Sequence, residues 1–128
     1  MICPSVPLTA AAEEKLDVAE MKRLRWSLGI TSRDIERNHT IQCKVGVAKV
    51  SKKVQESRLR WYGHVLRREE EYVGRKVLKM KLPGKRKRGR PKWRWMDNIK
   101  KDMEEVGLEE VDAQDRLRWR QSIRCGDP

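Results

Sequence analysis

The 128-residue sequence contains no phenylalanine and no long apolar run. Without Phe, the five Trp and two Tyr residues must supply all aromatic packing. Only 38% of the residues are hydrophobic, against roughly 45–50% in typical soluble domains. We therefore expect a small core and marginal stability for the isolated chain. No stretch approaches the ~20 apolar residues of a membrane-spanning helix, so we expect no membrane partner.

Cysteine is also scarce, and its placement excludes the usual cysteine-based sites. The three residues Cys3, Cys43 and Cys125 lie far apart and form no CxxC pair. His39 and His64 complete no zinc-ligand spacing with them. We expect neither a disulfide framework nor a metal site, and a reducing compartment fits this pattern.

The N-terminal residues have none of the features of a secretory signal. Residues 1–8 lack a charged start and a long apolar stretch. Pro4 and Pro7 instead predict a flexible, disordered tail over residues 1–8. We expect an intracellular protein, in the nucleus or the cytoplasm, that is not secreted.

Catalytic motifs are missing as well. The sequence contains neither GxxxxGK[ST] nor GxGxxG, and its aspartates are scattered rather than paired for two-metal catalysis. We therefore expect no enzyme activity, no cofactor and no small-molecule substrate.

What the chain has in excess is positive charge. Thirty-one Lys and Arg residues against nineteen Asp and Glu residues give a formal net charge of +12. Such a balance favours nucleic acid as the partner, ahead of an anionic membrane surface or an acidic protein.

The strongest concentration of charge lies in residues 85–95, around an Arg-Gly-Arg-Pro sequence. Gly89 allows close approach of the backbone to a ligand, and Pro91 favours an extended chain. Two arginines flanking such a bend could enter a narrow A·T minor groove, and the segment resembles an AT-hook. A nuclear-localisation signal and a disordered basic loop remain alternative interpretations. The candidate nucleic-acid-binding residues are Lys85, Arg86, Lys87, Arg88, Gly89, Arg90, Lys92 and Arg94, with Trp93 for base stacking.

Hydrophobic periodicity predicts a mainly α, loosely packed helical fragment of about four to six helices. Residues 72–82 are expected to be extended or a frayed turn. The predicted organisation is a tail over 1–8, a helical segment over 9–68 with the longest helix near 50–68, a linker over 69–92 with a basic loop at 82–92, and two C-terminal helices within 93–128. The predicted helices cover residues 9–28, 33–38, 40–45, 50–68, about 91–107, and 111–124.

The string Arg-Leu-Arg-Trp occurs three times, at residues 23–26, 58–61 and 116–119. In each predicted helix we expect the Leu to pack inward and the Trp to cover a flank of the core. Stacking of these Trp residues on bases is the alternative.

The helix predicted before Gly107 carries its charges against the helix dipole. Lys92 and Arg94 stand at its start, whereas Asp102, Glu104 and Glu105 stand near its end. A basic start could meet phosphate groups, while the acidic end is expected to carry no function.

Several blocks occur in an order that resembles the C-terminal tail of the reverse-transcriptase polyprotein of non-LTR (LINE-type) retrotransposons. The resemblance covers about residue 13 to the end. The blocks are Leu16-Asp17-Val18-Ala19-Glu20-Met21, Leu24-Arg25-Trp26, Gly29-Ile30-Thr31-Ser32-Arg33-Asp34, Arg58-Leu59-Arg60-Trp61-Tyr62-Gly63-His64-Val65, Lys87-Arg88-Gly89-Arg90-Pro91-Lys92, Trp95-Met96-Asp97, Asp115-Arg116, Trp119-Arg120 and Ile123-Arg124.

The resemblance implies a tail that holds template RNA or target DNA beside a polymerase. The family's aromatic-Ala-Asp-Asp polymerase signature has no counterpart here, so no catalytic residue is carried over. The leading hypothesis is a non-catalytic, nucleic-acid-binding remnant of such a polyprotein. The alternatives are a helical packing segment for an upstream polymerase domain, or an orphan reading frame with no selected function.

Overall fold

The computed structural model describes residues 8–81, 83–85, 87–91 and 93–126. These residues form helices and connections and contain no β-strand, which confirms the prediction of a mainly helical fold. Residues 1–7 of the predicted tail lie outside the described residues. The helices, including the 3-10 helices η1 and η2, are α1 (Ala10–Ser27), η1 (Ser32–Asp34), α2 (Asn38–Val45), α3 (Val50–Leu66), α4 (Val73–Lys79), α5 (Trp95–Val106), η2 (Glu110–Gln114) and α6 (Arg116–Ile123).

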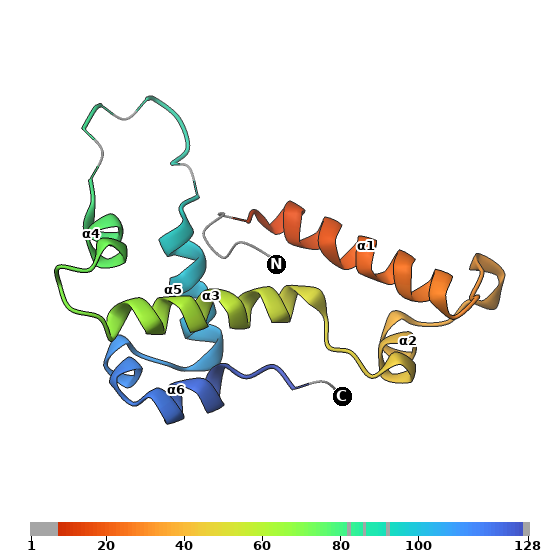
Figure 1. Ribbon diagram of the computed structural model, residues 1–128. Coiled ribbons are helices and arrows are strands. Elements are labelled where there is room, and N and C mark those ends of the chain that lie inside the picture. Colours follow the sequence, from red (N-terminus) through yellow and green to blue (C-terminus); the bar gives the residue numbers. More distant parts are fainter. Residues whose placement is uncertain (1–7, 82, 86, 92, 127–128) are drawn as a thin grey trace.

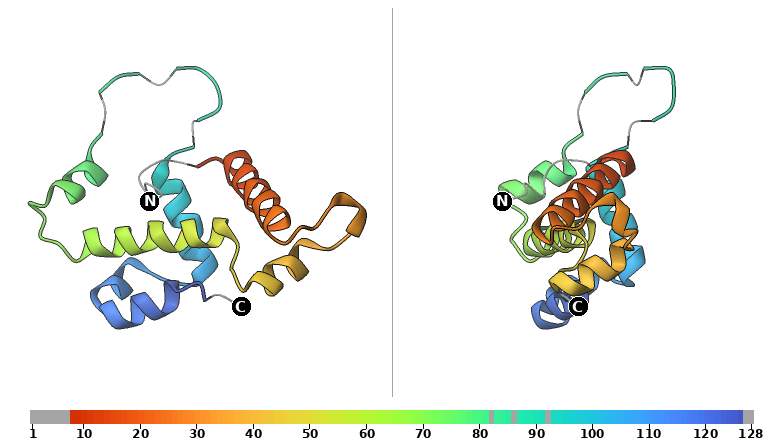
Figure 2. Two further views of the ribbon diagram at one scale, coloured as in Figure 1. Left: turned by 45° about the vertical axis from the view of Figure 1, so that its right-hand side comes forward. Right: turned by 90° about the vertical axis from the view of Figure 1, so that its right-hand side faces the viewer.

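Helix α3 is the element on which the others pack. It contacts α1, α4, α5, α6 and η2, and Figure 1 shows it lying across the molecule with α5 crossing it and α6 alongside. Helix α2 contacts α1 and lies at the far end of the molecule from α4 (Figure 1). The fold is therefore a set of short helices around one central helix rather than a parallel bundle (Figure 2).

The hydrophobic core lies where α3, α5, η2 and α6 meet. Trp95 extends it at one edge, with its ring edge-on to Trp61 at a centroid distance of 5.2 Å. Helix α1, by contrast, buries only Met21. The buried core residues are Leu59, Tyr62, Ile99, Met103, Leu108, Ala113, Trp119 and Ile123.

The tightest contact in this core joins α6 to α3. The indole N–H of Trp119 donates to the backbone oxygen of Leu59 at 3.0 Å, with both groups buried. Trp119 comes this close because Gly63 stands opposite its ring. A Cβ at Gly63 would lie 2.3 Å from Nε1 of Trp119.

Helix α1 holds α3 through polar contacts at the start of α3. Lys49, which precedes α3, provides no side-chain cap. Instead, Glu20 accepts from the backbone N–H of Val50, and Asp17 accepts from that of Ser51, each at 3.3 Å. Two carboxylates from α1 thus satisfy N–H groups that have no partner within α3 and face the positive end of its dipole.

Several predicted boundaries match the structure. Thr9 caps α1, since its hydroxyl accepts from Ala12 N–H. Gly46 and Gly107 follow the ends of α2 and α5 with φ values of 74° and 71°, in the left-handed region that glycine tolerates best.

Other boundaries were predicted wrongly. The region predicted as a helix over 33–38 is the three-residue η1 followed by a turn, because Ile35 takes a φ of 45°. Arg25 holds this turn by donating to the backbone oxygen of Glu36 at 2.8 Å and to Asn38 Oδ1 at 3.0 Å. Helix α1, with 18 residues, is one residue longer than α3, so the longest helix is not the one near 50–68.

The region predicted as extended or frayed over 72–82 contains helix α4. Helix α5 begins at Trp95, so Pro91 lies outside its first turn. The helix predicted over 111–124 is divided at Asp115 into η2 and α6.

The three Arg-Leu-Arg-Trp strings take three different environments. Leu59 is buried as predicted, but Leu117 is 72% exposed and Trp119 is buried in its place. Trp26 is 86% exposed and covers no core. Asp115 caps α6 by accepting from the N–H groups of Leu117 and Arg118. The cap restarts the helix in a register that turns Trp119 and Ile123 inward.

We predict that Gly63→Ala destabilises the fold by about 1–3 kcal/mol, because the added methyl group must displace Trp119 from the core. Gly126→Ala is the matched control, since a Cβ there meets nothing within 4 Å. Urea unfolding of both variants tests this expectation. Equal urea midpoints for Gly63→Ala and Gly126→Ala would show that Gly63 and Trp119 are not closely packed.

We also predict that folding stability falls at alkaline pH through Tyr62. Its hydroxyl donates to Glu110 Oε1 at 2.8 Å. Burial, with this hydrogen bond and the charge of Glu110, raises the pKa of the Tyr62 phenol above its ordinary value. Above about pH 10 the unfolded chain loses this proton first, so the free energy of unfolding decreases by up to about 1.4 kcal/mol per pH unit.

Chemical unfolding of Tyr62→Phe and Tyr72→Phe variants isolates this contribution. The stability advantage of the wild type over Tyr62→Phe should shrink as pH rises past 10. Tyr72 lies on the surface (38% exposed), and its replacement should leave the alkaline decrease in place. If the free energy of unfolding of Tyr62→Phe still decreases above pH 10 as it does in the wild type, groups other than Tyr62 cause the decrease.

A candidate nucleic-acid interface

The positive charge of the chain is concentrated in one segment. Residues 72–96 contain eleven Lys and Arg residues and no acidic residue, while the rest of the chain contains twenty cations and nineteen acids. The remainder is therefore almost neutral, and the net charge of +12 comes almost entirely from α4 and the connection that follows it.

The α4 end of this segment is partly neutralised by the acidic run just before it. Lys76 pairs with Glu71 at 2.7 Å and Lys79 with Glu70 at 2.9 Å. The hydrogen bond from Lys79 lowers the pKa of Glu70. Arg75 donates to the backbone oxygen of Arg68 at 2.8 Å. The α4 cations thus have local partners, which leaves the following connection as the source of uncompensated charge.

That connection, which we call the basic loop (residues 81–94), extends away from the helices between α4 and α5 (Figures 1 and 2). Lys85, Lys87, Arg88 and Arg90 are exposed, and none of them makes an ion pair or hydrogen bond with another residue in the described part of the chain. Four cations without a partner are therefore available to an external anion. The predicted residues Arg86 and Lys92 lie outside the described residues.

Glycine shapes the loop at two points. Gly84 and Gly89 have φ values of 136° and 132°, which L side chains rarely adopt. Gly89 separates Arg88 from Arg90 within the Arg-Gly-Arg-Pro sequence, and a Cβ there would meet nothing within 4 Å. Gly89 is therefore required by backbone conformation and not by packing.

The C-terminal end of the loop returns to the helical body. The indole N–H of Trp93 donates to Asn98 Oδ1, and Asn98 Nδ2 donates to the backbone oxygen of Leu8 at 3.1 Å. Trp93 is nevertheless 53% exposed. Its ring is thus held in position by one edge while much of its surface remains open.

The start of α5 is already occupied by an acidic side chain. Arg94 is exposed, and its backbone N–H donates to Asp97 Oδ2 at 2.8 Å. Asp97 therefore fills part of the position at which we expected phosphate to meet the helix N-terminus. The Arg94 side chain remains available, but the helix end contributes less than predicted.

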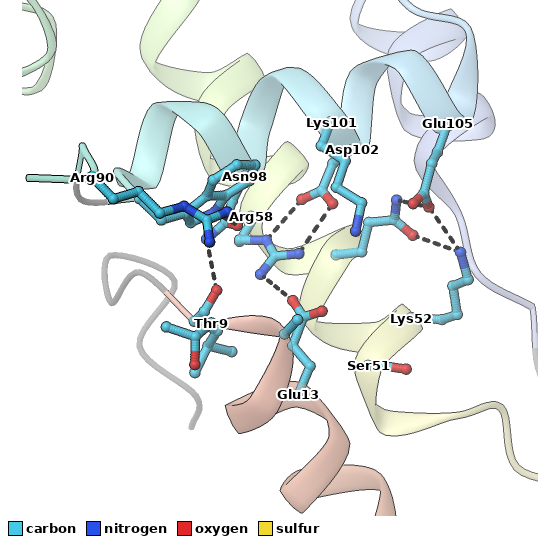
Figure 3. Close-up of a pocket in the computed structure, with 14 residues that line it drawn as sticks. Thr9, Glu13, Ser51, Lys52, Arg58, Arg90, Asn98, Lys101, Asp102 and Glu105 are labelled. Carbon is cyan, nitrogen blue, oxygen red and sulfur yellow. Dashed lines mark hydrogen bonds and ion pairs between the residues drawn. The ribbon is translucent and has the colours of Figure 1, made fainter.

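Beneath the end of the loop lies a cavity of about 580 Å³ between α1, α3 and α5. Figure 3 shows Arg90 and Asn98 at one end, Lys101, Asp102 and Glu105 along α5, and Thr9 and Glu13 facing them from α1. Arg90 and Trp93 therefore belong both to the predicted basic strip and to the wall of this cavity. Sequence reasoning did not predict this cavity or its residues Asn98 and Lys101.

A buried ion-pair network forms the floor of the cavity. Arg58 binds Asp102 with two hydrogen bonds, Nε to Oδ2 at 2.8 Å and Nη2 to Oδ1 at 3.1 Å. Its third nitrogen, Nη1, donates to Glu13 Oε1 at 2.9 Å. The network therefore joins α3, α5 and α1 through a single guanidinium group.

Burial affects the two main partners in this network differently. It raises the pKa of Asp102 above its ordinary value, and the hydrogen bonds from Arg58 oppose this shift. Burial alone would lower the pKa of Arg58, but the hydrogen bonds to Asp102 and Glu13 outweigh it. Arg58 therefore remains a permanent cation that needs both carboxylates. The acidic end of α5, which we expected to carry no function, thus supplies partners for α3.

No protein-family model, curated protein or solved structure matches this chain. Among the described residues, none of the helices is both long and apolar enough to cross a membrane. The same residues contain no cluster of three or more His, Cys, Asp and Glu side chains that could hold a metal ion.

We predict that Arg58→Met lowers the free energy of unfolding by about 3–5 kcal/mol, because Asp102 loses its buried partner. Arg60→Met is the control from the same Arg-Leu-Arg-Trp string. The Arg60 side chain is 66% exposed and pairs with the buried Glu56, which also accepts from the backbone N–H of Cys125 at 3.0 Å. Glu56 keeps that hydrogen bond when Arg60 is replaced, so Arg60→Met should cost less stability than Arg58→Met.

Adding Asp102→Leu to Arg58→Met should recover part of the lost stability, since no unpaired buried carboxylate then remains. Thermal and urea unfolding of the three variants measure these differences. Similar losses for Arg58→Met and Arg60→Met would mean that the network contributes no more than the ion pair of the exposed Arg60.

Proposed function

We propose that this protein binds nucleic acid through the basic loop, as a non-catalytic remnant of a LINE-type retrotransposon reverse-transcriptase polyprotein. The observation that carries the proposal is the separation of charge, in which an almost neutral helical body presents one exposed segment rich in unpaired cations. The ordered sequence blocks that resemble the polyprotein tail support the proposed origin.

Phosphate contact is the chemistry that this loop supports best. Lys85, Lys87 and Arg88 are exposed and unpaired within the described residues, so they lose no internal ion pair when they bind a polyanion. Each phosphate that they neutralise releases condensed counterions, which favours binding at low salt. The loop therefore supplies affinity for DNA or RNA in general.

Recognition of A·T sequence would require Arg88 and Arg90 to enter one groove together. Gly89 provides the open backbone that an AT-hook needs, but Arg90 also lines the cavity beneath the loop. The proposal therefore has two forms. The broader form requires only that the loop binds phosphate groups, and the narrower form requires in addition that Arg88 and Arg90 enter an A·T minor groove. The same basic segment fits a nuclear-localisation signal, so we propose the nucleus, ahead of the cytoplasm, as the location of the protein.

Packing against an upstream polymerase domain is the second candidate function. The observation that favours it is the exposure of large apolar side chains at the end of the molecule away from the loop. Trp26 and Ile35 are 86% and 89% exposed. Single exposed apolar residues are common in soluble proteins, so this candidate ranks second.

A salt-titrated binding series on A·T duplex, G·C duplex and single-stranded RNA tests the proposal. We expect log affinity to fall linearly with log salt, with a slope of about −0.9 per phosphate contacted on duplex DNA. Arg88→Ala with Arg90→Ala should reduce the slope by roughly 2 and abolish any A·T preference.

Lys22→Ala with Arg23→Ala on α1 is the matched control, because both side chains are exposed and the same amount of charge is removed. This control should leave the slope nearly unchanged. If both double variants lower affinity equally, net charge and not the loop determines binding. If the wild type binds none of the three nucleic acids, the proposal is wrong.

A further inference from the structure

The charged residues around the cavity are mostly committed to one another. Arg58 binds Asp102 and Glu13. Lys52 pairs with Glu105 at 3.1 Å, and this contact lowers the pKa of Glu105. All three carboxylates of the wall are therefore paired within the protein, although Arg58 and Lys52 supply only two positive charges for them.

Two cations of the cavity wall have no carboxylate partner. Arg90 and Lys101 make no ion pair or hydrogen bond with any other residue that the structure describes. They come from the loop and from α5, so they flank the cavity from two elements (Figure 3). With Arg90 and Lys101 included, the wall carries four cations and three carboxylates, a formal surplus of one positive charge that suits one phosphate group.

An aromatic surface completes this arrangement. Trp93 lines the same cavity, and its hydrogen bond to the buried Asn98 fixes its position while half of the residue stays exposed. Asn98 is itself held by Leu8. A ring positioned in this way loses little conformational entropy when a flat ligand stacks on it.

We propose that this cavity binds one nucleotide of a single-stranded nucleic acid, with the base stacked on Trp93 and its phosphate held by Arg90 and Lys101. This inference rests on the proposed function, to which it adds the form of nucleic acid. The volume of about 580 Å³ lies within the roughly 300–1,000 Å³ of small-ligand sites. Duplex bases are stacked and paired, so a single strand reaches the cavity at a lower energetic cost.

Binding of an oligothymidylate and of an abasic deoxyribose-phosphate strand of equal length tests the site. Stacking contributes about 1–3 kcal/mol per base, so Trp93→Ala should weaken oligothymidylate binding about 5- to 150-fold and leave the abasic strand unaffected. Trp93→Phe keeps an aromatic face and should retain most of the affinity, which separates stacking from loss of the Asn98 hydrogen bond.

Lys101→Ala and Lys100→Ala provide a matched pair of neighbouring exposed cations, of which only Lys101 lines the cavity. Lys101→Ala should weaken binding of both strands several-fold more than Lys100→Ala. Equal effects of the two lysine variants, or an equal effect of Trp93→Ala on both strands, would overturn the cavity proposal. Salt-dependent binding that still requires Arg88 would then preserve the proposed function, whereas no binding of either strand by the wild type would overturn both.

Discussion

The arrangement of the helices depends on one buried cation. Arg58 lies in the middle of α3 and is 3% exposed, so its charge must be compensated inside the protein. Asp102 on α5 and Glu13 on α1 compensate it, which fixes both helices against α3. The cavity lies beside this network and is lined by residues of α1, α3 and α5. The same constraint thus determines the position of α1, the floor of the cavity and the positions of Asn98 and Lys101.

Much of the fold could be predicted because apolar periodicity and end signals agree with local energetics. The positions of α1, α3 and α5, and glycine at the ends of α2 and α5, follow from such signals. The errors arise where tertiary contacts decide. Leu117 has the inward spacing of its predicted helix, yet the cap at Asp115 changes the register and buries Trp119 instead. The apolar residues of the stretch 72–82 alternate only loosely, and no residue of α4 is fully buried, so burial imposes no clear helical pattern on this part of the sequence.

The candidate site also has one part that the sequence predicted and one part that it did not. The basic loop was predictable because a dense run of like charge, with Gly and Pro, rarely forms a core. The cavity was not, since its walls come from three helices distant in sequence. The sequence nevertheless contained one signal of the ion-pair network beneath the cavity. Arg58 occupies the position four residues after the buried Val54 on α3, and an arginine on an inward face requires an acidic partner. The carboxylates that oppose the dipole at the end of α5 supply that partner.

The basic loop differs from a basic tail because both of its ends are anchored. Helix α4 packs on α3 at one end, and α5 packs on α3 at the other, so the loop is closed across a fixed distance. A closed loop samples fewer conformations than a free tail of equal length. Less conformational entropy is lost when such a loop is ordered on a polyanion. Under the proposed function, the anchored ends would therefore raise the affinity for a polyanion that each cation of the loop provides.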